Sequence, residues 1–301
     1  MPELKKIAIL LLFAVIFAAG CSSPQPSANA DPANIRVMRD GMDTSVVMPL
    51  HPRRVISLAP NITEMIFAAG GGDRLVGVTT YCNFPEAARD IKRVGDTLSP
   101  NVETVIALQP EVVFVSRDSQ LESFRQILLD RKISVFVVDI ASFDDITSGL
   151  RRFGEIFGTE SIAAAAADDI ERRVAAVKAE RPPHQPRIFV QISQEPLFTV
   201  GAGSLPVELV RTAGGEVVTA TIATAYPKLS KETALALEPD IIILSDSEDN
   251  RRPNEVFART AAATNGKVYR IDPDLLSRPG PRSVDALEQI ADILAKASTN
   301  P

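Results

Sequence analysis

The chain contains no tryptophan, only two histidines and only two cysteines among its 301 residues. Two cysteines cannot build a disulfide framework. His51 and His184 both stand beside prolines in predicted surface loops, which leaves little scope for a nucleophile activated by an adjacent base. Metal-spaced Cys/His clusters, a Gly-x-Ser-x-Gly motif and a His-Glu-x-x-His motif are all missing. The sequence therefore disfavours an enzyme and predicts neither a cofactor nor a metal site.

Positive charge is also scarce. Lys and Arg number 32 against 38 Asp and Glu, which gives a net charge of −6 and an isoelectric point near 5.2. A nucleic-acid partner is not expected, because no basic field offsets phosphate repulsion. Hydrophobic residues make up 45% of the chain and helix-type and strand-type segments alternate along it. This composition predicts one large or two modest globular domains.

Long apolar runs are confined to the N-terminus. Lys5 and Lys6 precede an apolar run over residues 7–19. As a helix this run would span about 20 Å, too short for a stable membrane anchor. A basic start, a short apolar core and small residues before a cleavage site predict a secretory signal peptide over residues 1–20.

The residues around Cys21 refine this prediction. The segment 17–21 (FAAGC) resembles a bacterial lipobox, in which Cys21 is diacylated and becomes the first residue of the mature chain; the alternative is an ordinary signal peptide. Residues 21–34 are rich in Ser, Pro, Ala and Asn and predict a flexible tether. Cys82 is then the remaining thiol, and we expect it to be a packed small apolar group. The sequence predicts a body held outside the cytoplasm by a lipid anchor.

Alternating strand and helix patterns predict an α/β fold with parallel sheets. A hairpin is expected over residues 35–48, and a buried strand over residues 54–58. Asn61 followed by Glu64 predicts the capped start of a helix.

Residues 159–181 read as one long helix, with Thr159 as its cap and two prolines after its end. Its apolar stripe is expected to contain Ile162, Ala166, Ile170 and Val174. Two acid-before-base pairs four residues apart are expected to support it, Asp168 with Arg172 and Asp169 with Arg173.

An internal repeat is the most informative feature. Residues 101–115 (NVETVIALQPEVVFV) align without gaps on residues 230–244 (SKETALALEPDIIIL), and each copy reads as a capped short helix, a proline and a buried strand. One interpretation is convergence on a common helix-to-strand turn. The other, which we favour, is two similar lobes, over residues 35–158 and 182–301, with parallel central sheets, joined by one long interdomain α-helix and separated by a ligand cleft.

Five segments carry a resemblance to a known family. They are residues 54–64 (RVISLAPNITE), 77–85 (GVTTYCNFP), 100–110 (PNVETVIALQP), 226–232 (YPKLSKE) and 278–282 (RPGPR). Over nearly the whole mature chain the sequence resembles the substrate-binding proteins of cobalamin-type ABC importers. This group belongs to the class of periplasmic binding proteins with a rigid interdomain helix, which also serves haem and ferric siderophores.

The resemblance implies a set of ligand-binding residues. Tyr81 would form an aromatic wall of the cleft on the first lobe, and Phe198 and Tyr226 would do so on the second, with core packing as the alternative for each. Tyr226 stands where relatives usually have Trp, so stacking area is lost. Asp274 and Arg278 match a polar pair that hydrogen-bonds corrin amides; the alternative is a mutual surface ion pair. Thr97 and Ser116 fall where the family often has large aromatics.

The resemblance also implies partners. Glu103 and Glu232 match two acidic residues that dock onto arginines of the transporter's membrane subunits. Each also lies in the predicted first turn of a helix, where a carboxylate is favoured in any case. We expect a lipid-anchored monomer that captures a corrinoid and delivers it to an ABC importer. The alternatives are haem or a ferric siderophore in the same fold, a lipid-anchored hydrolase, and a purely structural envelope lipoprotein.

Overall fold

The computed structural model describes residues 34–117, 119 and 122–299. The predicted signal peptide, Cys21 and the predicted tether as far as residue 33 lie outside the described residues. Within the described part of the chain, none of the helices combines the length and apolar character needed to cross a membrane.

The first half of the described chain contains a four-stranded parallel sheet in the order β4-β3-β5-β6. An antiparallel hairpin, β1–β2, precedes it in the chain, as predicted. The strands are β1 (Ile35–Arg39), β2 (Ser45–Pro49), β3 (Val55–Ser57), β4 (Leu75–Val78), β5 (Val112–Ser116) and β6 (Ser134–Val138). The helices are α1 (Pro60–Ala68), α2 (Val102–Ala107), α3 (Glu122–Asp130) and α4 (Phe143–Phe157), with short 3-10 turns η2 (Gly72–Arg74) and η3 (Glu86–Asp90).

The second half repeats this topology. Its parallel strands lie in the order β9-β7-β10-β11, and β8 adds antiparallel to β7. Apart from β8, the two sheets share one strand order: with the strands of each sheet numbered as they follow in the chain, both sheets read 2-1-3-4. The strands are β7 (Arg187–Ser193), β8 (Phe198–Thr199), β9 (Glu216–Val217), β10 (Ile241–Ser245) and β11 (Val268–Ile271). The helices are α6 (Leu205–Ala213), α7 (Lys231–Leu235), α8 (Ala261–Thr264), α9 (Pro273–Ser277) and α10 (Ser283–Thr299), with 3-10 turns η4 (Glu248–Asn250) and η5 (Glu255–Phe257).

We call the parts built around these two sheets the first and the second lobe. Their matching parallel sheets confirm the predicted fold class. The residue boundaries assigned to the lobes from the sequence stay a prediction.

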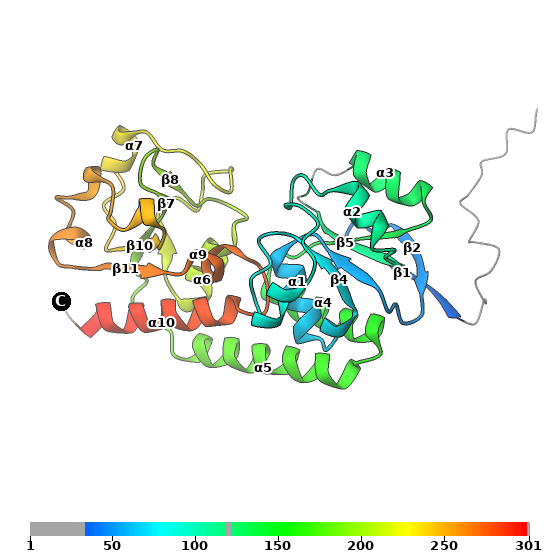
Figure 1. The fold of residues 1–301 in the computed structure, drawn as a ribbon. Coiled ribbons are helices and arrows are strands. Elements are labelled where there is room, and N and C mark those ends of the chain that lie inside the picture. Colours follow the sequence, from blue (N-terminus) through cyan, green and yellow to red (C-terminus); the bar gives the residue numbers. More distant parts are fainter. Residues whose placement is uncertain (1–33, 118, 120–121, 300–301) are drawn as a thin grey trace, which may run out of the picture. The chain divides into compact units, whose positions relative to one another are not determined.

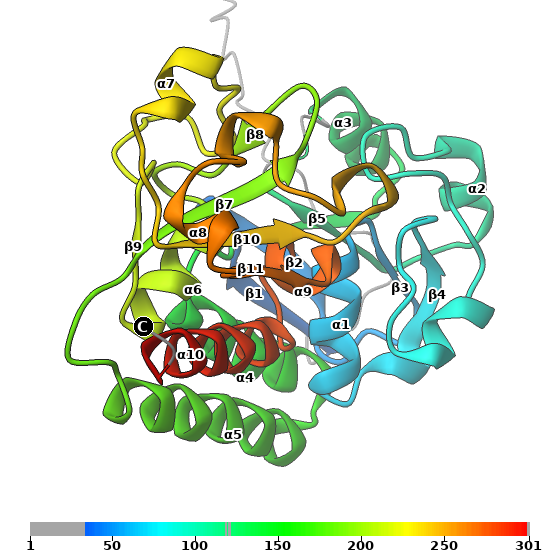
Figure 2. The same ribbon diagram turned by 90° about the vertical axis from the view of Figure 1, so that its left-hand side faces the viewer.

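The long helix α5 (Glu160–Ala179) lies in the chain between the two sheets. It contacts α1 and α4 of the first lobe and α6 and α10 of the second, and in both ribbon views it runs alongside α10 (Figures 1 and 2). The predicted stripe was wrong at Ile162, which is 52% exposed. A strict spacing of four advances by about 40° at each step around a helix of 3.6 residues per turn, so such a stripe drifts off the buried face. The buried residues instead alternate spacings of four and three: Ala163, Ala167, Ile170, Val174 and Val177.

Each sheet has one face on a shared core and one on a core of its own. Along β5, Val112 and Phe114 belong to a large apolar cluster that also includes residues of α5 and of the second sheet, whereas Val113 and Val115 belong to a cluster within the first lobe. Strand β10 alternates in the same way: Ile241 and Ile243 face the shared cluster, and Ile242 and Leu244 face a cluster within the second lobe. The period-2 alternation of a strand thus ties both lobes to one continuous core.

The internal repeat has equivalent positions in the two lobes. Residues 101–115 form α2 and β5, and residues 230–244 form α7 and β10, the third strand of each sheet. The side chains of Asn101 and Ser230 cap these helices, each accepting the backbone N–H three residues on, at 2.8 and 3.1 Å. Convergence on a common turn does not account for matching strand positions, so the two-lobe interpretation holds.

An arginine from outside the repeat makes an equivalent hydrogen bond in each lobe. Arg54, before β3, donates through Nη2 to the carbonyl of Leu108 at 2.5 Å, just beyond α2. Arg187, at the start of β7, donates through Nη2 to the carbonyl of Leu237 at 2.7 Å, just beyond α7. These donors satisfy carbonyls that a helix leaves unpaired at its C-terminus. We call the two contacts the arginine latches.

Two local predictions need correction. Helix α1 begins at Pro60, its N-cap is Ala59, and no side chain caps it, so Asn61 is not the N-cap. Glu64 does not complete a capping box, because its carboxylate binds Arg282 of the second lobe. Proline has no N–H that would need a partner at the first helical position, so the helix can start two residues earlier than predicted.

Candidate ligand-binding site

A pocket of about 230 Å³ is lined by residues of both lobes. Part of its lining lies at the carboxyl ends of strands β3 and β5, where open parallel sheets usually bind ligands. Residues 59–61 follow β3, and Ser116 ends β5. Ser277 ends α9, and residues 278–279 follow that helix. The lining consists of Ala59, Pro60, Asn61, Thr97, Leu98, Ser116, Ser119, Ser277, Arg278 and Pro279. Since small-molecule sites generally measure about 300–1,000 Å³, this pocket suits one edge of a large ligand rather than all of it.

A polar network lies between the lobes beside this pocket. Glu64 of α1 has a side chain only 3% exposed and accepts two hydrogen bonds from the Arg282 guanidinium, at 2.6 and 2.9 Å. Arg278 forms an ion pair with Asp274 at 2.6 Å and approaches Glu64 at 3.7 Å. Asn83, in the turn after β4, bonds both Asp274 and Arg278. We call these five residues the inter-lobe network.

Its charges balance, with two carboxylates against two guanidiniums. Hydrogen bonding to the Glu64 carboxylate raises the pKa of Arg282 above its usual value, against the opposing effect of burial. The Arg282 guanidinium also lies over the ring of Phe84, 4.2 Å from its centroid, an arrangement that favours a cation. A buried pair of this kind is stable only when its remaining hydrogen-bonding groups are satisfied. The network therefore fixes the contact between the lobes beside the pocket.

The structure brings three of the predicted ligand residues, Thr97, Ser116 and Arg278, into the pocket lining. Asp274 lies next to Arg278 as its ion-pair partner, so the mutual pair is present in this structure. Tyr81, Phe198 and Tyr226 are not among the described lining residues. Tyr81 and Tyr226 are 58% and 41% exposed, respectively, which core packing does not explain, while Phe198 is half-buried in β8. The ligand role of all seven stays a prediction.

Sequence reasoning missed several residues of this site. It treated Asn61 and Glu64 as helix-capping residues and assigned nothing to Asn83 or Leu98. Leu98 is 75% exposed and lines the pocket, where it adds apolar surface. Asn83 could have been found in the turn at residues 77–85. This turn carries the family resemblance, but a ligand role was assigned there only to Tyr81.

The predicted docking residues occupy equivalent positions. Glu103 and Glu232 are each the second residue of their helix, α2 and α7, and both are exposed. Hydrogen bonds from its own backbone N–H and from Ser230 lower the pKa of Glu232. Helix capping therefore contributes at Glu232, as the alternative interpretation holds. Both helices lie on the side of the molecule away from α5 and α10 (Figures 1 and 2).

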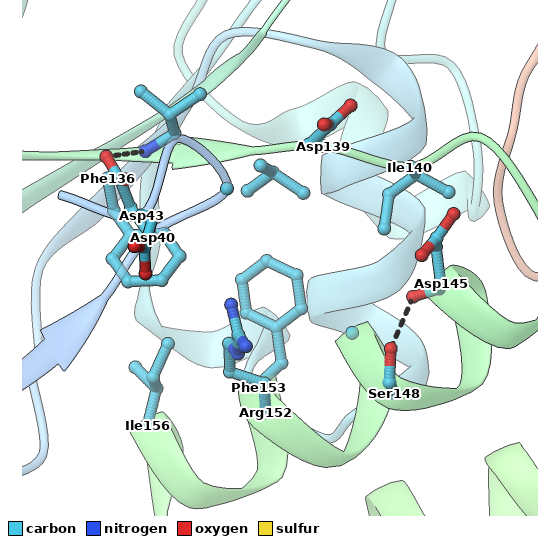
Figure 3. A pocket seen from close by; sticks show the side chains of 14 residues that line it. Asp40, Asp43, Phe136, Asp139, Ile140, Asp145, Ser148, Arg152, Phe153 and Ile156 are labelled. Carbon is cyan, nitrogen blue, oxygen red and sulfur yellow. Dashed lines mark hydrogen bonds between the residues drawn. The ribbon is translucent and has the colours of Figure 1, made fainter.

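A second pocket, of about 310 Å³, lies within the first lobe, between the β1–β2 turn, the end of β6 and α4 (Figure 3). Its carboxylates already have partners. Asp40 accepts the N–H groups of Met42 and Thr44, both at 2.9 Å, and Asp145 accepts from Ser142 at 2.7 Å. Among the described residues there is also no group of three or more His, Cys, Asp and Glu side chains arranged to hold a metal ion.

The two histidines are both exposed. Nδ1 of His51 lies 3.4 Å from the carbonyl of Ile156, and neither histidine is among the described lining residues of either pocket. Cys82 is buried, as predicted, with its Sγ 3.1 Å from the hydroxyls of Thr63 and Thr79. The described site therefore contains hydrogen-bonding and apolar groups, without a nucleophile beside a base.

Residues 55–275 match the family model described as periplasmic binding protein. The chain belongs to the periplasmic binding protein family. It is therefore a solute-binding protein that acts outside the cytoplasm, and not an enzyme. The match spans the residues of both sheets, β3 to β11, and the pocket up to its last few lining residues.

Curated relatives extend over most of the chain. The vitamin B12-binding protein of Vibrio cholerae is 28% identical over 253 residues, which are 82% of this chain and 90% of that protein. An uncharacterized ABC transporter substrate-binding lipoprotein of Bacillus subtilis is 27% identical over 300 residues, 94% of each chain.

Solved structures show the same fold. The crystal structure of the periplasmic vitamin B12-binding protein of Vibrio cholerae has a TM-score of 0.75 and 28% identity, covering 83% of this chain and 99% of that one. A periplasmic heme-binding protein from Roseiflexus has a TM-score of 0.73 at 20% identity, covering 82% and 99%. At that identity the second likeness speaks for the fold alone.

Proposed function

We propose that the protein is a lipid-anchored substrate-binding protein that captures a cobalamin-like corrinoid between its lobes and delivers it to an ABC importer. The observation that carries this proposal is the pocket at the strand ends, lined from both lobes and bordered by a charge-balanced polar network. Some of the relatives above share at least 25% identity with this chain and have a name that states a ligand. In each of these the ligand is vitamin B12.

The chemistry of the site suits a corrinoid. A corrin ring is broad and apolar on its faces and carries neutral amide groups around its edge. Exposed Tyr81 and Tyr226, with Phe198, supply aromatic contact area that costs little side-chain entropy to order. Arg278 and Asp274 supply a donor and an acceptor side by side, and Leu98 supplies apolar contact where Thr97 and Ser116 replace large aromatics. No cofactor takes part, since the corrinoid is cargo.

The anchor and the partner belong to the same proposal. Cys21 would carry the lipid, in keeping with the lipoprotein name of the Bacillus subtilis relative. Glu103 and Glu232 would meet the paired membrane subunits of the importer, because equivalent exposed carboxylates on two like lobes match a partner with approximate two-fold symmetry. We expect the protein itself to act as a monomer and to bind no nucleic acid.

Calorimetric titration of the purified protein tests the ligand. Cyanocobalamin, dicyanocobinamide, hemin and a ferric hydroxamate siderophore are titrated in turn. The expected result is tight binding of the two corrinoids, with hemin and the siderophore weaker by about tenfold or more, or about 1.4 kcal/mol. Tight hemin binding with no corrinoid heat would replace the corrinoid with haem and leave the fold assignment unchanged.

A further inference from the structure

We propose that Asn83 holds Asp274 and Arg278 in a fixed, charge-balanced arrangement that selects ligands with neutral amide groups at their edge over ligands with carboxylates. The inference rests on the proposed function, because it concerns the same cleft. It adds a positioning residue and a physical reason for the choice of ligand class.

The amide of Asn83 joins the two lobes through both of its ends. Its Nδ2 donates to Oδ2 of Asp274 at 2.9 Å, and its Oδ1 accepts from Nη1 of Arg278 at 2.7 Å. The orientation of the amide follows from chemistry, since an ionised carboxylate only accepts and a guanidinium only donates. A side chain from the turn after β4 therefore determines the geometry of two residues in the second lobe.

This arrangement leaves a donor in the pocket lining and an acceptor directly beside it. Arg278 lines the pocket with its side chain 17% exposed, and Asp274 beside it is 29% exposed. A guanidinium has five N–H groups and a carboxylate about four acceptor sites, more than the contacts to Asn83, to Glu64 and to each other consume. A primary amide, with one acceptor and two donors, is complementary to this pair.

The charges argue against a ligand rich in carboxylates. Arg278 is the one charged residue in the described lining, and its charge is already matched by Asp274 and by the nearby Glu64. Arg282 is likewise matched by Glu64. A haem propionate entering here would lose its hydration without gaining an unpaired cation, and burying an unmatched charge is costly.

The chain offers a matched control in Asn61. Like Asn83, Asn61 crosses between the lobes, since its Nδ2 donates to the carbonyl of Pro279 at 3.2 Å. Unlike Asn83, it also belongs to the described pocket lining, so its replacement is expected to affect both ligands alike. No described hydrogen bond joins it to Asp274 or Arg278. Replacing either asparagine with alanine removes one bridge between the lobes, but only the change at Asn83 releases the charged pair.

The test measures dissociation constants of dicyanocobinamide and hemin for the full-length protein in detergent. Asn83→Ala is expected to weaken cobinamide binding about tenfold and to change hemin binding by less than about threefold, so that the selectivity ratio falls. Asn61→Ala is expected to leave that ratio unchanged. Asp274→Asn, which leaves a surplus positive charge, is expected to strengthen hemin binding about tenfold.

Asn83→Asp keeps the size and shape of the native side chain, so it separates the loss of the hydrogen bond from any misfolding caused by a smaller residue. Asn83→Asp still accepts from Arg278 but cannot donate to Asp274, and it is expected to weaken both ligands while its thermal transition stays cooperative. If Asn83→Ala and Asn61→Ala shift both ligands by equal factors, Asn83 merely bridges the lobes and the inference is wrong. If the unmodified protein binds neither cobinamide nor cyanocobalamin, the proposed function itself is overturned.

Discussion

Glu64 and Arg282 show how one buried ion pair joins elements 218 residues apart in the chain. The carboxylate leaves α1 and meets a guanidinium from the segment before α10, so the pair forms only when both lobes are folded against each other. Two hydrogen bonds, Arg278 nearby and the ring of Phe84 supply the surroundings that make a desolvated charge tolerable. At the residue scale, the contact between the lobes is therefore electrostatic as well as apolar.

Arg282→Met is expected to lower the free energy of unfolding by about 3 kcal/mol, because it leaves the Glu64 carboxylate buried with Arg278 alone nearby. Glu64→Gln/Arg282→Met is expected to cost less than the sum of the two single changes, since no buried charge is then left without its partner. Urea unfolding at pH 7, followed by circular dichroism, measures all four proteins. Additive single changes would contradict the coupling.

Helix α5 is held to α10 by charge as well as by its apolar face. Arg173 bonds Asp285 at 2.6 Å and Glu288 at 2.5 and 2.8 Å, and it approaches Asp169 of its own helix at 3.8 Å. The other predicted pair of α5 does not form: Asp168 binds Arg151 of α4 instead of Arg172. At the element scale, the charged side chains of α5 contact neighbouring helices as well as each other. Arg172 pairs with Asp169 within the helix, while Asp168, Glu171 and Arg173 bind residues of α4 and α10.

The Arg173 contact predicts a pH dependence. Its hydrogen bond to Arg173 lowers the pKa of Glu288 in the folded protein, so this carboxylate adds stability above its unfolded pKa of about 4.3 and loses it as the pH falls through the folded pKa. Glu288→Gln is expected to cost about 0.5–1 kcal/mol at pH 7, a small value because the Glu288 side chain is 44% exposed. The difference should shrink in urea unfolding as the pH falls below the unfolded pKa of about 4.3 and through the lowered folded pKa. Exposed Glu180→Gln serves as the control, and a loss independent of pH would contradict the assignment.

The likeness of the two lobes is the main feature at the scale of the whole molecule. The arginine latches hold the ends of α2 and α7, and the residues that follow, Gln109 and Glu238, share a left-handed backbone with φ of 47° and 42°. Each helix buries only one residue, Val105 or Ala234, so caps and latches determine its position more than packing does. The shared core leads us to expect small rotations of the lobes rather than wide closure.

Replacing Glu103 and Glu232 together with alanine is expected to reduce importer-dependent uptake of labelled cobalamin by about tenfold or more, because both lobes lose their charged contact. Ligand affinity measured by calorimetry should not change, since both residues lie outside the described pocket lining. The matched control replaces Glu122 and Glu248, exposed first-turn acids of α3 and η4, one in each lobe. A fall in ligand affinity in the Glu103/Glu232 variant would refute the docking assignment.

Local and repeated features were predictable from the sequence. The repeat over residues 101–115 and 230–244, the long helix and the buried strands follow from periodicity and capping, which act over a few residues. They were enough to predict two parallel sheets of like topology joined by α5. Ile162 was placed wrongly because helical spacing alone does not say which face the neighbouring helices cover.

The chain's own pattern of apolar residues, caps and repeated segments determined the two lobes, because each of these signals is complete within a short stretch. Only the tertiary structure decided how Glu64, Asn83, Asp274, Arg278 and Arg282 meet. A hydrogen bond between residues some 190 positions apart leaves no trace in local periodicity, since it depends on the angle at which two finished lobes pack. The polar contact between the lobes beside the pocket, and with it the proposed basis for choosing a ligand, exists only once both lobes are in place.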